Sequence, residues 1–226
     1  MKKTPQKRIL ALLLALALSA GTAPCALAAE SLADYVDLDR GAWYMPGVRY
    51  CLNHELMSGY RNFGMHFEPN MPMTRAQFAT ILWRLEGEPK AGLAMQYADV
   101  AEDIWYAEAV RWALASDIMG GYTVRTFAPD DPVTREQIAA ILYRYAQYRS
   151  DGALPTISDP GYAQYGDRNE VSDYAAEGME WACAMGIVMG LQDKHGDAWL
   201  MPWGNSSRAA VATMLMRFCL DMGIYE

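Results

Sequence analysis

The chain has 226 residues, of which 52% are hydrophobic and 20% charged, so it is long enough for one large domain or several small repeats. Its formal net charge of -8 at pH 7 excludes nucleic-acid binding by bulk electrostatic attraction. Its three histidines, His54, His66 and His195, fit no zinc-protease motif, and the sequence holds no nucleophile elbow or phosphate loop. We therefore predict that the protein is not an enzyme and carries no cofactor or metal.

The first element in the chain is a predicted secretion signal over residues 1–28. Four basic residues precede an apolar run over 9–20, and the small-x-small pattern at 26–28 is typical of a signal-peptidase site. The run is too short and wrongly flanked for a membrane span. We expect cleavage near Ala28 or Ala29, which leaves 15 of the 19 basic residues against 27 acidic ones, a formal charge of -12. No membrane span is expected after the signal.

The mature chain would keep three cysteines, Cys51, Cys183 and Cys219. An odd number in an exported protein does not suggest a disulfide framework. Cys51 and Cys183 stand among apolar neighbours, so we predict buried thiols.

Three similar blocks follow the signal, over 34–86, 97–149 and 162–221. Each opens on a Tyr-x-Asp sequence and continues into a helical stretch with apolar residues at i, i+3, i+4 and i+8. These apolar residues are Val48, Cys51, Leu52 and Leu56; Val110, Ala113, Leu114 and Ile118; and Met179, Ala182, Cys183 and Ile187. A glycine suited to a left-handed helix cap then follows in each block: Gly59, Gly121 and Gly190.

A loop leads from each first helix to a second, whose apolar residues recur at i, i+3, i+4 and i+7. They are Phe78, Ile81, Leu82 and Leu85; Ile138, Ile141, Leu142 and Tyr145; and Val211, Met214, Leu215 and Phe218. A helix–loop–helix unit cannot bury its apolar stripe alone, so three copies imply mutual packing into one body. The predicted fold class is all-α.

The second helices of the first two blocks have strong start signals. Thr74 and Thr134 are predicted N-caps, each with a Gln three residues later that completes a capping box. Each helix nevertheless begins with an arginine, Arg75 or Arg135, where the helix dipole favours an acidic residue by about 0.3–1 kcal/mol.

Two interpretations of these arginines remain open and are compatible. In the first, an anion docks beside the guanidinium and the unpaired N–H groups of the helix start. Alternatively, Arg75 and Arg135 pair internally with a carboxylate such as Asp37 or Asp99.

These blocks resemble the S-layer homology domain. The resemblance rests on the succession Tyr97–Val100, Trp105–Tyr106, Ile118–Gly121, Phe127–Pro129 and Val133–Gln137, and on its counterparts in the other blocks. The family's most recognisable sequence, a Thr-Arg-Ala-Glu-like helix start, stands here as Thr-Arg-Ala-Gln at 74–77 and Thr-Arg-Glu-Gln at 134–137, and decays to Ser-Arg-Ala-Ala at 207–210. The resemblance covers roughly Asp34 to Asp221.

The resemblance implies a pseudo-threefold spindle with a central three-helix bundle and grooves between neighbouring repeats. It also implies that the grooves bind secondary cell-wall polysaccharide, commonly with a pyruvyl ketal on a terminal aminosugar, and so hold the protein at the cell surface. The glycan-binding residues that it implies are Arg75, Arg135, Arg208, Trp43, Trp105, Gly59 and Gly121.

Several of these residues also have a structural explanation. Trp43 and Trp105 open the first helix of their blocks and suit either a sugar platform or the core. We assign Trp112 and Trp181 to the core, since they adjoin the apolar stripe. The aspartates of the Tyr-x-Asp sequences (Asp37, Asp99 and Asp167) are predicted to be turn or cap residues.

Two functional hypotheses follow, a glycan-binding anchor and an assembly protein whose repeats bind another envelope protein. The second is credible because the chain ends at Glu226 with no cargo domain. In the third block Ala210 replaces the capping-box Gln, so we expect the groove of Arg208 to be weaker than those of Arg75 and Arg135.

Overall fold

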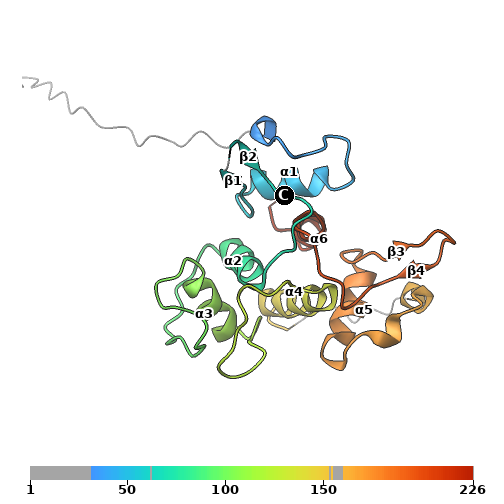
Figure 1. The fold of residues 1–226 in the computed structure, drawn as a ribbon. Coiled ribbons are helices and arrows are strands. Elements are labelled where there is room, and N and C mark those ends of the chain that lie inside the picture. Colours follow the sequence, from blue (N-terminus) through green and yellow to red (C-terminus); the bar gives the residue numbers. More distant parts are fainter. Residues whose placement is uncertain (1–31, 62, 153, 155–159, 226) are drawn as a thin grey trace, which may run out of the picture. The chain divides into compact units, whose positions relative to one another are not determined.

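Figure 1 shows the fold in a computed structural model that describes residues 32–61, 63–152, 154 and 160–225. The predicted signal at 1–28 lies outside the described residues. The α-helices are α1 (Met45–Asn53), α2 (Arg75–Leu85), α3 (Ala107–Ala115), α4 (Arg135–Arg149), α5 (Ala176–Ala184) and α6 (Arg208–Asp221). The three blocks at 34–86, 97–149 and 162–221 are called the first, second and third units. Two antiparallel pairs of short strands lie in the first and third units: β1 (Tyr60–Arg61) with β2 (Met65–His66), and β3 (Leu191–Gln192) with β4 (Ala198–Trp199).

Four short 3-10 helices complete the regular structure of the described residues: Leu32–Asp34, Pro160–Gln164, Arg168–Glu170 and Asp173–Ala175. The protein is thus mostly helical, and the prediction of an all-α repeat fold is confirmed. Every helix in the described ranges is too short or too polar to cross a membrane.

The main helix pairs join different units (Figure 1). The second helix of each unit packs on the first helix of the next: α2 on α3, α4 on α5, and α6 back on α1. Glycines allow two of these close approaches. A Cβ on Gly47 of α1 would lie 2.6 Å from Cα of Thr213 in α6, and one on Gly178 of α5 would lie 2.8 Å from Cα of Ala140 in α4. Each of these helix pairs therefore joins two repeats, and the pair of α6 with α1 joins the third repeat back to the first.

The segments before the three second helices form a ring of main-chain hydrogen bonds. Val133 N–H donates to Met73 O (2.8 Å), Met73 N–H to Ser206 O (2.9 Å), and Ser206 N–H to Val133 O (3.0 Å). The three residues occupy the same position of their units, directly before the N-cap. Each unit therefore donates to one neighbouring unit and accepts from the other. This is the pattern that a pseudo-threefold arrangement requires.

Side chains join the second helices at their other ends. The ring of Tyr145 in α4 stacks on Phe218 of α6 with centroids 5.6 Å apart. The Tyr145 hydroxyl donates to Glu86, which ends α2, at 2.7 Å, and Arg149 donates to the same carboxylate oxygen. Nine apolar residues of the second helices, three from each, are all buried: Phe78, Ile81, Leu82, Ile138, Ile141, Leu142, Val211, Met214 and Leu215. The central bundle therefore has contacts at both ends.

The prediction of left-handed glycine caps is wrong. The residues with positive φ stand earlier, directly before the buried Leu56, Ile118 and Ile187. They are Glu55 (φ 56°), Asp117 (φ 54°) and Gly186 (φ 65°). The chain therefore leaves each first helix through a left-handed residue that is glycine only in the third unit.

The predicted cap glycines have a different role, which Gly121 illustrates. A Cβ there would lie 2.3 Å from Thr126 O and 2.6 Å from Cε1 of Tyr97. The Gly121 N–H donates to the Tyr97 hydroxyl at 2.8 Å. Gly59 and Gly190 meet Tyr35 and Tyr165 in the same way. Glycine is needed because the tyrosine of each Tyr-x-Asp sequence lies against the main chain.

The aspartates of the Tyr-x-Asp sequences hold the loops, as predicted. The two carboxylate oxygens of Asp99 accept the N–H groups of Phe127 (2.9 Å) and Ala128 (2.7 Å). Burial opposes ionisation of Asp99, but these main-chain bonds outweigh it and hold its pKa below the ordinary value. Asp37 and Asp167 make the equivalent bonds in their units.

Candidate ligand-binding site

The start of α2 offers no main-chain donor to a ligand at its first three positions. Arg75 N–H donates to Asp131 O and Ala76 N–H to Pro129 O, both at 2.9 Å, while Gln77 N–H donates to the Thr74 hydroxyl. The starts of α4 and α6 are satisfied in the same way by carbonyls of neighbouring units. The predicted capping boxes of α2 and α4 are confirmed. The idea that an anion meets the helix N–H groups is wrong, because those groups already have partners.

The guanidinium groups at these helix starts are also bound to carbonyls. Arg75 donates from Nε to Phe127 O (3.0 Å) and from Nη2 to Gly120 O (2.7 Å). Arg135 bonds to Leu200 O and Met189 O, and Arg208 to Phe67 O and Ser58 O. Their hydrogen-bond partners are therefore main-chain carbonyls of the next unit, and not the carboxylates of Asp37 or Asp99.

Burial and aromatic rings surround these cations. Burial lowers the pKa of Arg75, but arginine stays protonated at any physiological pH. Cζ of Arg75 lies 4.4 Å from the ring centroid of Tyr122 and 4.9 Å from that of Phe127. Arg208 stacks in the same manner on Tyr60 and Phe67. Arg75 and Arg208 are thus held between main-chain carbonyls and aromatic rings, and neither of the two carbonyl bonds uses Nη1.

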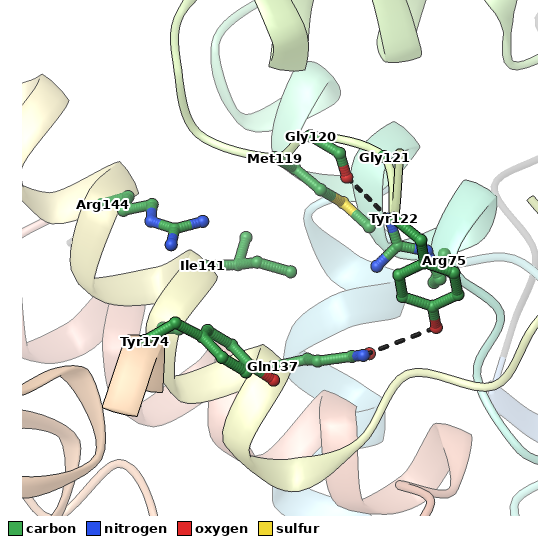
Figure 2. Close-up of a pocket in the computed structure, with 10 residues that line it drawn as sticks. Arg75, Met119, Gly120, Gly121, Tyr122, Gln137, Ile141, Arg144 and Tyr174 are labelled. Atoms are coloured by element: carbon green, nitrogen blue, oxygen red, sulfur yellow. Dashed lines mark hydrogen bonds between the residues drawn. The ribbon is translucent and has the colours of Figure 1, made fainter. Parts of the chain in front are cut away.

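A cavity of about 290 Å³ opens beside Arg75 (Figure 2). We name it the Arg75 cavity. Arg75 comes from α2 of the first unit, and the other walls come from the second and third units. The lining residues are Arg75, Met119, Gly120, Gly121, Tyr122, Gln137, Ala140, Ile141, Arg144 and Tyr174.

A second cavity of about 200 Å³, the Arg208 cavity, repeats this arrangement one unit away. Its lining residues are Leu56, Met57, Ser58, Tyr60, Gln77, Thr80, Ile81, Arg84, Trp105 and Arg208. In each cavity the arginine of one unit, the glutamine and loop of the next, and an aromatic ring of the unit after that come together. The described residues that line the two cavities include four arginines and no aspartate or glutamate.

The capping-box glutamines connect the helix starts to these cavities. Gln77 accepts the Thr74 N–H through Oε1 and donates from Nε2 to the Tyr60 hydroxyl at 2.8 Å. Gln137 repeats the bond to Tyr122 at 3.5 Å, as Figure 2 shows. One side chain therefore fixes both the helix start and a wall of the cavity.

Three tyrosines of the cavities, Tyr60, Tyr122 and Tyr174, were missed by the sequence analysis. Tyr60 and Tyr122 directly follow the glycines that were singled out, and Tyr174 stands where the other units have Trp43 and Trp105. Two repeated positions therefore carry the signal: the residue after the glycine gives Tyr60 and Tyr122, and the position of Trp43 and Trp105 gives Tyr174.

Tyr174 is positioned by a buried carboxylate. Its hydroxyl donates to Glu136 at 2.8 Å, and Glu136 also accepts the main-chain N–H and hydroxyl of Ser172. Burial, together with this carboxylate, raises the pKa of Tyr174, so the phenol stays protonated. The charge of Glu136 is thus met by three donors beside the Arg75 cavity.

The surroundings of Arg135 differ from those of the other two arginines. At the positions of Tyr60 and Gln77 the third unit has Leu191 and Ala210. Arg135 extends into this third unit, where its Nη2 donates to Met189 O at 2.8 Å. The substitutions of the third block therefore affect the surroundings of Arg135. Because each arginine reaches into the following unit, these substitutions lie in the unit that Arg135 contacts, and α6 also lacks a capping box. That the site of Arg208 is the weaker one stays a prediction.

The predicted site residues are thus distributed over two cavities and their margins. Arg75 and Gly121 line one cavity, and Arg208 and Trp105 line the other. Gly59 lies between Ser58 and Tyr60 of the Arg208 cavity. Trp43, which is 66% exposed, and Arg135 are not among the lining residues of either. Trp112 and Trp181 are buried, as predicted.

One group of side chains has the composition of a metal site. Ligand atoms of Asp37, His66 and Glu68 lie within 4.8 Å of one another. The carboxylate of Asp37 already accepts the N–H groups of Phe67 and Glu68, at 2.8 and 2.7 Å. The equivalent aspartates make the same bonds without a neighbouring histidine, so the geometry is explained by the loop.

The fold and cavities define a helical repeat protein with ligand-sized cavities between its repeats. The model of the S-layer homology domain family matches residues 34–79 and 96–139. The two matched segments are the first two units, which are therefore S-layer homology domains.

Curated relatives agree with this assignment. The chain is 29% identical over 153 residues to an amylopullulanase of Thermoanaerobacterium thermosulfurigenes, which covers 66% of this chain and 8% of the relative. It is 32% identical over 146 residues to a surface layer protein of Brevibacillus choshinensis, covering 63% and 13%. It is 32% identical over 85 residues to a cellulosome-anchoring protein of Acetivibrio thermocellus, covering 36% and 19%. The chain thus matches less than a fifth of each relative, and the named enzymatic activity does not transfer with it.

Proposed function

We propose that this protein is held at the bacterial cell surface by binding secondary cell-wall polysaccharide in the Arg75 and Arg208 cavities. The observation that carries the proposal is the composition of these cavities. Each combines a fixed guanidinium, a tyrosine, a capping-box glutamine and a half-exposed aromatic ring, without an acidic residue among the described lining. In a chain of 27 acidic residues, this is the lining expected for an anionic sugar.

The relatives support the location. Three of those that the chain resembles are named as a surface layer protein, a middle cell wall protein and a cellulosome-anchoring protein. Non-covalent anchoring needs no catalytic group, so we propose a binding role and not an enzymatic one. The pyruvyl ketal implied by the family resemblance would supply the carboxylate that the arginines suit.

A second candidate, binding to another envelope protein, is favoured by the third unit. Between α5 and α6 it exposes five large apolar side chains: Met189, Leu191, Trp199, Met201 and Trp203. Apolar groups of this kind gather at protein interfaces. This surface lies in the unit where the polar cavity residues are replaced.

Sedimentation with purified cell-wall sacculi separates the two functions. We expect the protein to sediment with sacculi that carry their polysaccharide and to stay in solution after the polysaccharide is extracted. The double variant Tyr60→Ala/Tyr122→Ala should lose sedimentation while keeping its helical circular dichroism. Sedimentation that survives extraction would instead point to a protein partner.

A further inference from the structure

The second helices carry another arginine in register, nine residues after the first residue of the helix: Arg84 in α2, Arg144 in α4 and Arg217 in α6. Arg84 lines the Arg208 cavity and Arg144 lines the Arg75 cavity. Figure 2 shows Arg144 across the Arg75 cavity from Arg75, with Ile141 between them. Each cavity therefore contains two guanidinium groups that come from different helices.

The two arginines of a cavity differ in their partners. The buried Arg75 uses Nε and Nη2 on the carbonyls of Phe127 and Gly120. Arg84 and Arg144 are half-buried, and within the described part of the chain neither side chain makes a hydrogen bond or an ion pair. A half-buried cation without a partner keeps its full hydrogen-bonding capacity for a ligand.

Arg217 differs from its two counterparts. Its Nη1 donates to Ile187 O at 3.4 Å, and burial lowers its pKa. It occurs in the unit where Leu191 and Ala210 replace the tyrosine and glutamine. The chain thus provides its own comparison, two partnerless arginines in polar cavities and one that is bonded to the main chain.

We propose that Arg84 and Arg144 bind the carboxylate of the wall glycan, each opposite the guanidinium at the neighbouring helix start, Arg208 or Arg75. This rests on the proposed function and assigns the decisive charge to a residue outside the Thr-Arg helix-start sequence. A carboxylate has two oxygens and accepts from two cations at once. The helix-start arginine, Arg75 or Arg208, shapes the cavity and can donate to the carboxylate from Nη1. Arg144 or Arg84 donates from a guanidinium whose N–H groups are all available.

The groups that face Arg144 fit this assignment. Tyr174 and Gln137 lie beside it in the lining, and their polar groups bond to Glu136 and Tyr122. Glu136 is the acidic group in contact with Tyr174, and its oxygens already accept three donors. The apolar Ala140 and Ile141 complete the wall, and such surface suits a methyl group or the face of a sugar ring.

A pair of ligands tests the charge directly. The first is the methyl glycoside of an N-acetylhexosamine that carries a pyruvyl ketal, and the second is its isopropylidene ketal, in which a methyl group replaces the carboxylate. We expect the parent protein to bind two equivalents of the pyruvyl ketal, about tenfold or more tightly than the isopropylidene ketal. Isothermal titration calorimetry gives both affinity and stoichiometry.

Substitution of the arginines should remove that preference one site at a time. Arg84→Gln and Arg144→Gln should each lose one of the two tight sites, and the double variant both, while Arg217→Gln keeps both. Arg144→Lys should retain part of the preference because it keeps the charge. Equal melting temperatures for the Gln variants and the parent would establish that folding is unaffected.

The possible failures are distinguishable. If both Gln variants keep two tight sites, the assignment of Arg84 and Arg144 is overturned while glycan binding stands. If the parent sediments with walls but does not discriminate between the ketals, the carboxylate assignment is overturned. If the parent does not sediment with walls, the proposed function fails and this inference fails with it.

Discussion

The cavities of Arg75 and Arg208 and the surroundings of Arg135 share one scaffold but differ in chemistry. All three arginines make the same two bonds to main-chain carbonyls of the next unit. Two of them face a tyrosine and a glutamine, whereas Arg135 extends into the third unit, which has Leu191 and Ala210 at these positions. The helix-start arginine is therefore needed to join the repeats, whether or not a polar cavity lies beside it.

This comparison changes how the Thr-Arg sequence is understood. Its threonine, replaced by Ser207 in the third unit, caps the helix, and its arginine binds the following unit. The sequence therefore contributes to folding in all three units. The ability to bind an anion depends on other positions, among them those of Tyr122 and Arg144. Four predictions test this separation of scaffold and site.

The largest expected effect is on the scaffold and should be equal in all three units. Leu82→Ala, Leu142→Ala and Leu215→Ala each remove a fully buried side chain at the same helix position. Each should lower the free energy of unfolding by about 2–5 kcal/mol, measured by urea denaturation. Leu220→Ala, at a residue 58% exposed, is the control and should cost less than about 0.5 kcal/mol. A loss confined to one unit would contradict a shared centre.

The next effect concerns the glycines beside the tyrosines. An alanine at Gly121 would place Cβ 2.3 Å from Thr126 O, and one at Gly190 would place it 2.2 Å from Cε1 of Tyr165. Both changes should cost about 1–3 kcal/mol through overpacking. Only Gly121→Ala should also weaken binding to wall polysaccharide, because Gly121 lines a cavity.

The neighbouring glycine is the matched control for this prediction. A Cβ on Gly120 would meet only the Tyr97 hydroxyl, at 3.9 Å, so Gly120→Ala should leave stability unchanged. If Gly190→Ala reduced wall binding as much as Gly121→Ala, the third unit would have to be counted as a working site.

A gain of function is the third prediction. Leu191→Tyr with Ala210→Gln restores both missing polar residues of the third unit, and the glutamine completes a capping box with Ser207. The helix start should gain about 1 kcal/mol, and titration calorimetry should show an additional weak site for the glycan. The control is Leu191→Phe with Ala210→Gln, which restores the ring without its hydroxyl. Equal ligand stoichiometry for the two variants would contradict the role given to the tyrosine.

Much of the fold was predictable because it depends on local patterns. The apolar spacing of the six helices and the capping boxes at Thr74 and Thr134 were predicted correctly. The partners of the arginines were not, because a position inside one repeat does not show into which repeat its side chain extends. For the same reason local spacing does not show that Ala210 lies in the unit that Arg135 contacts.

The glycines show a second limit of sequence reasoning. A glycine after a helix is most often explained by a left-handed conformation, which Gly59, Gly121 and Gly190 do not have. Their requirement comes from a tyrosine ring 24 or 25 residues earlier in the chain. Contacts of this kind are not visible in local spacing, but the triple repetition of tyrosine and glycine was a usable signal.

The smallest effect is the pH dependence of the loop beside the Arg75 cavity. The pKa of Asp99 is held below its ordinary value, so its bonds to Phe127 and Ala128 stabilise the fold above the unfolded-state pKa. That contribution is lost as pH falls through the lower pKa of the folded state, below about pH 4. Since Asp99 is exposed, Asp99→Asn should cost only about 0.5 kcal/mol at neutral pH. The variant should then approach the parent in stability as pH falls.

This loop supplies the carbonyls of Phe127 and Gly120 that hold Arg75, so Asp99→Asn should also weaken glycan binding at neutral pH. The control is Asp103→Asn, at an exposed aspartate of the same unit, which should change neither stability nor binding. Urea denaturation of the three proteins between about pH 3 and pH 7 measures the first effect, and calorimetry at neutral pH the second. A stability difference between Asp99→Asn and the parent that stays constant down to pH 3 would show that the carboxylate charge does not hold this loop, and that the cavity keeps its shape by packing alone.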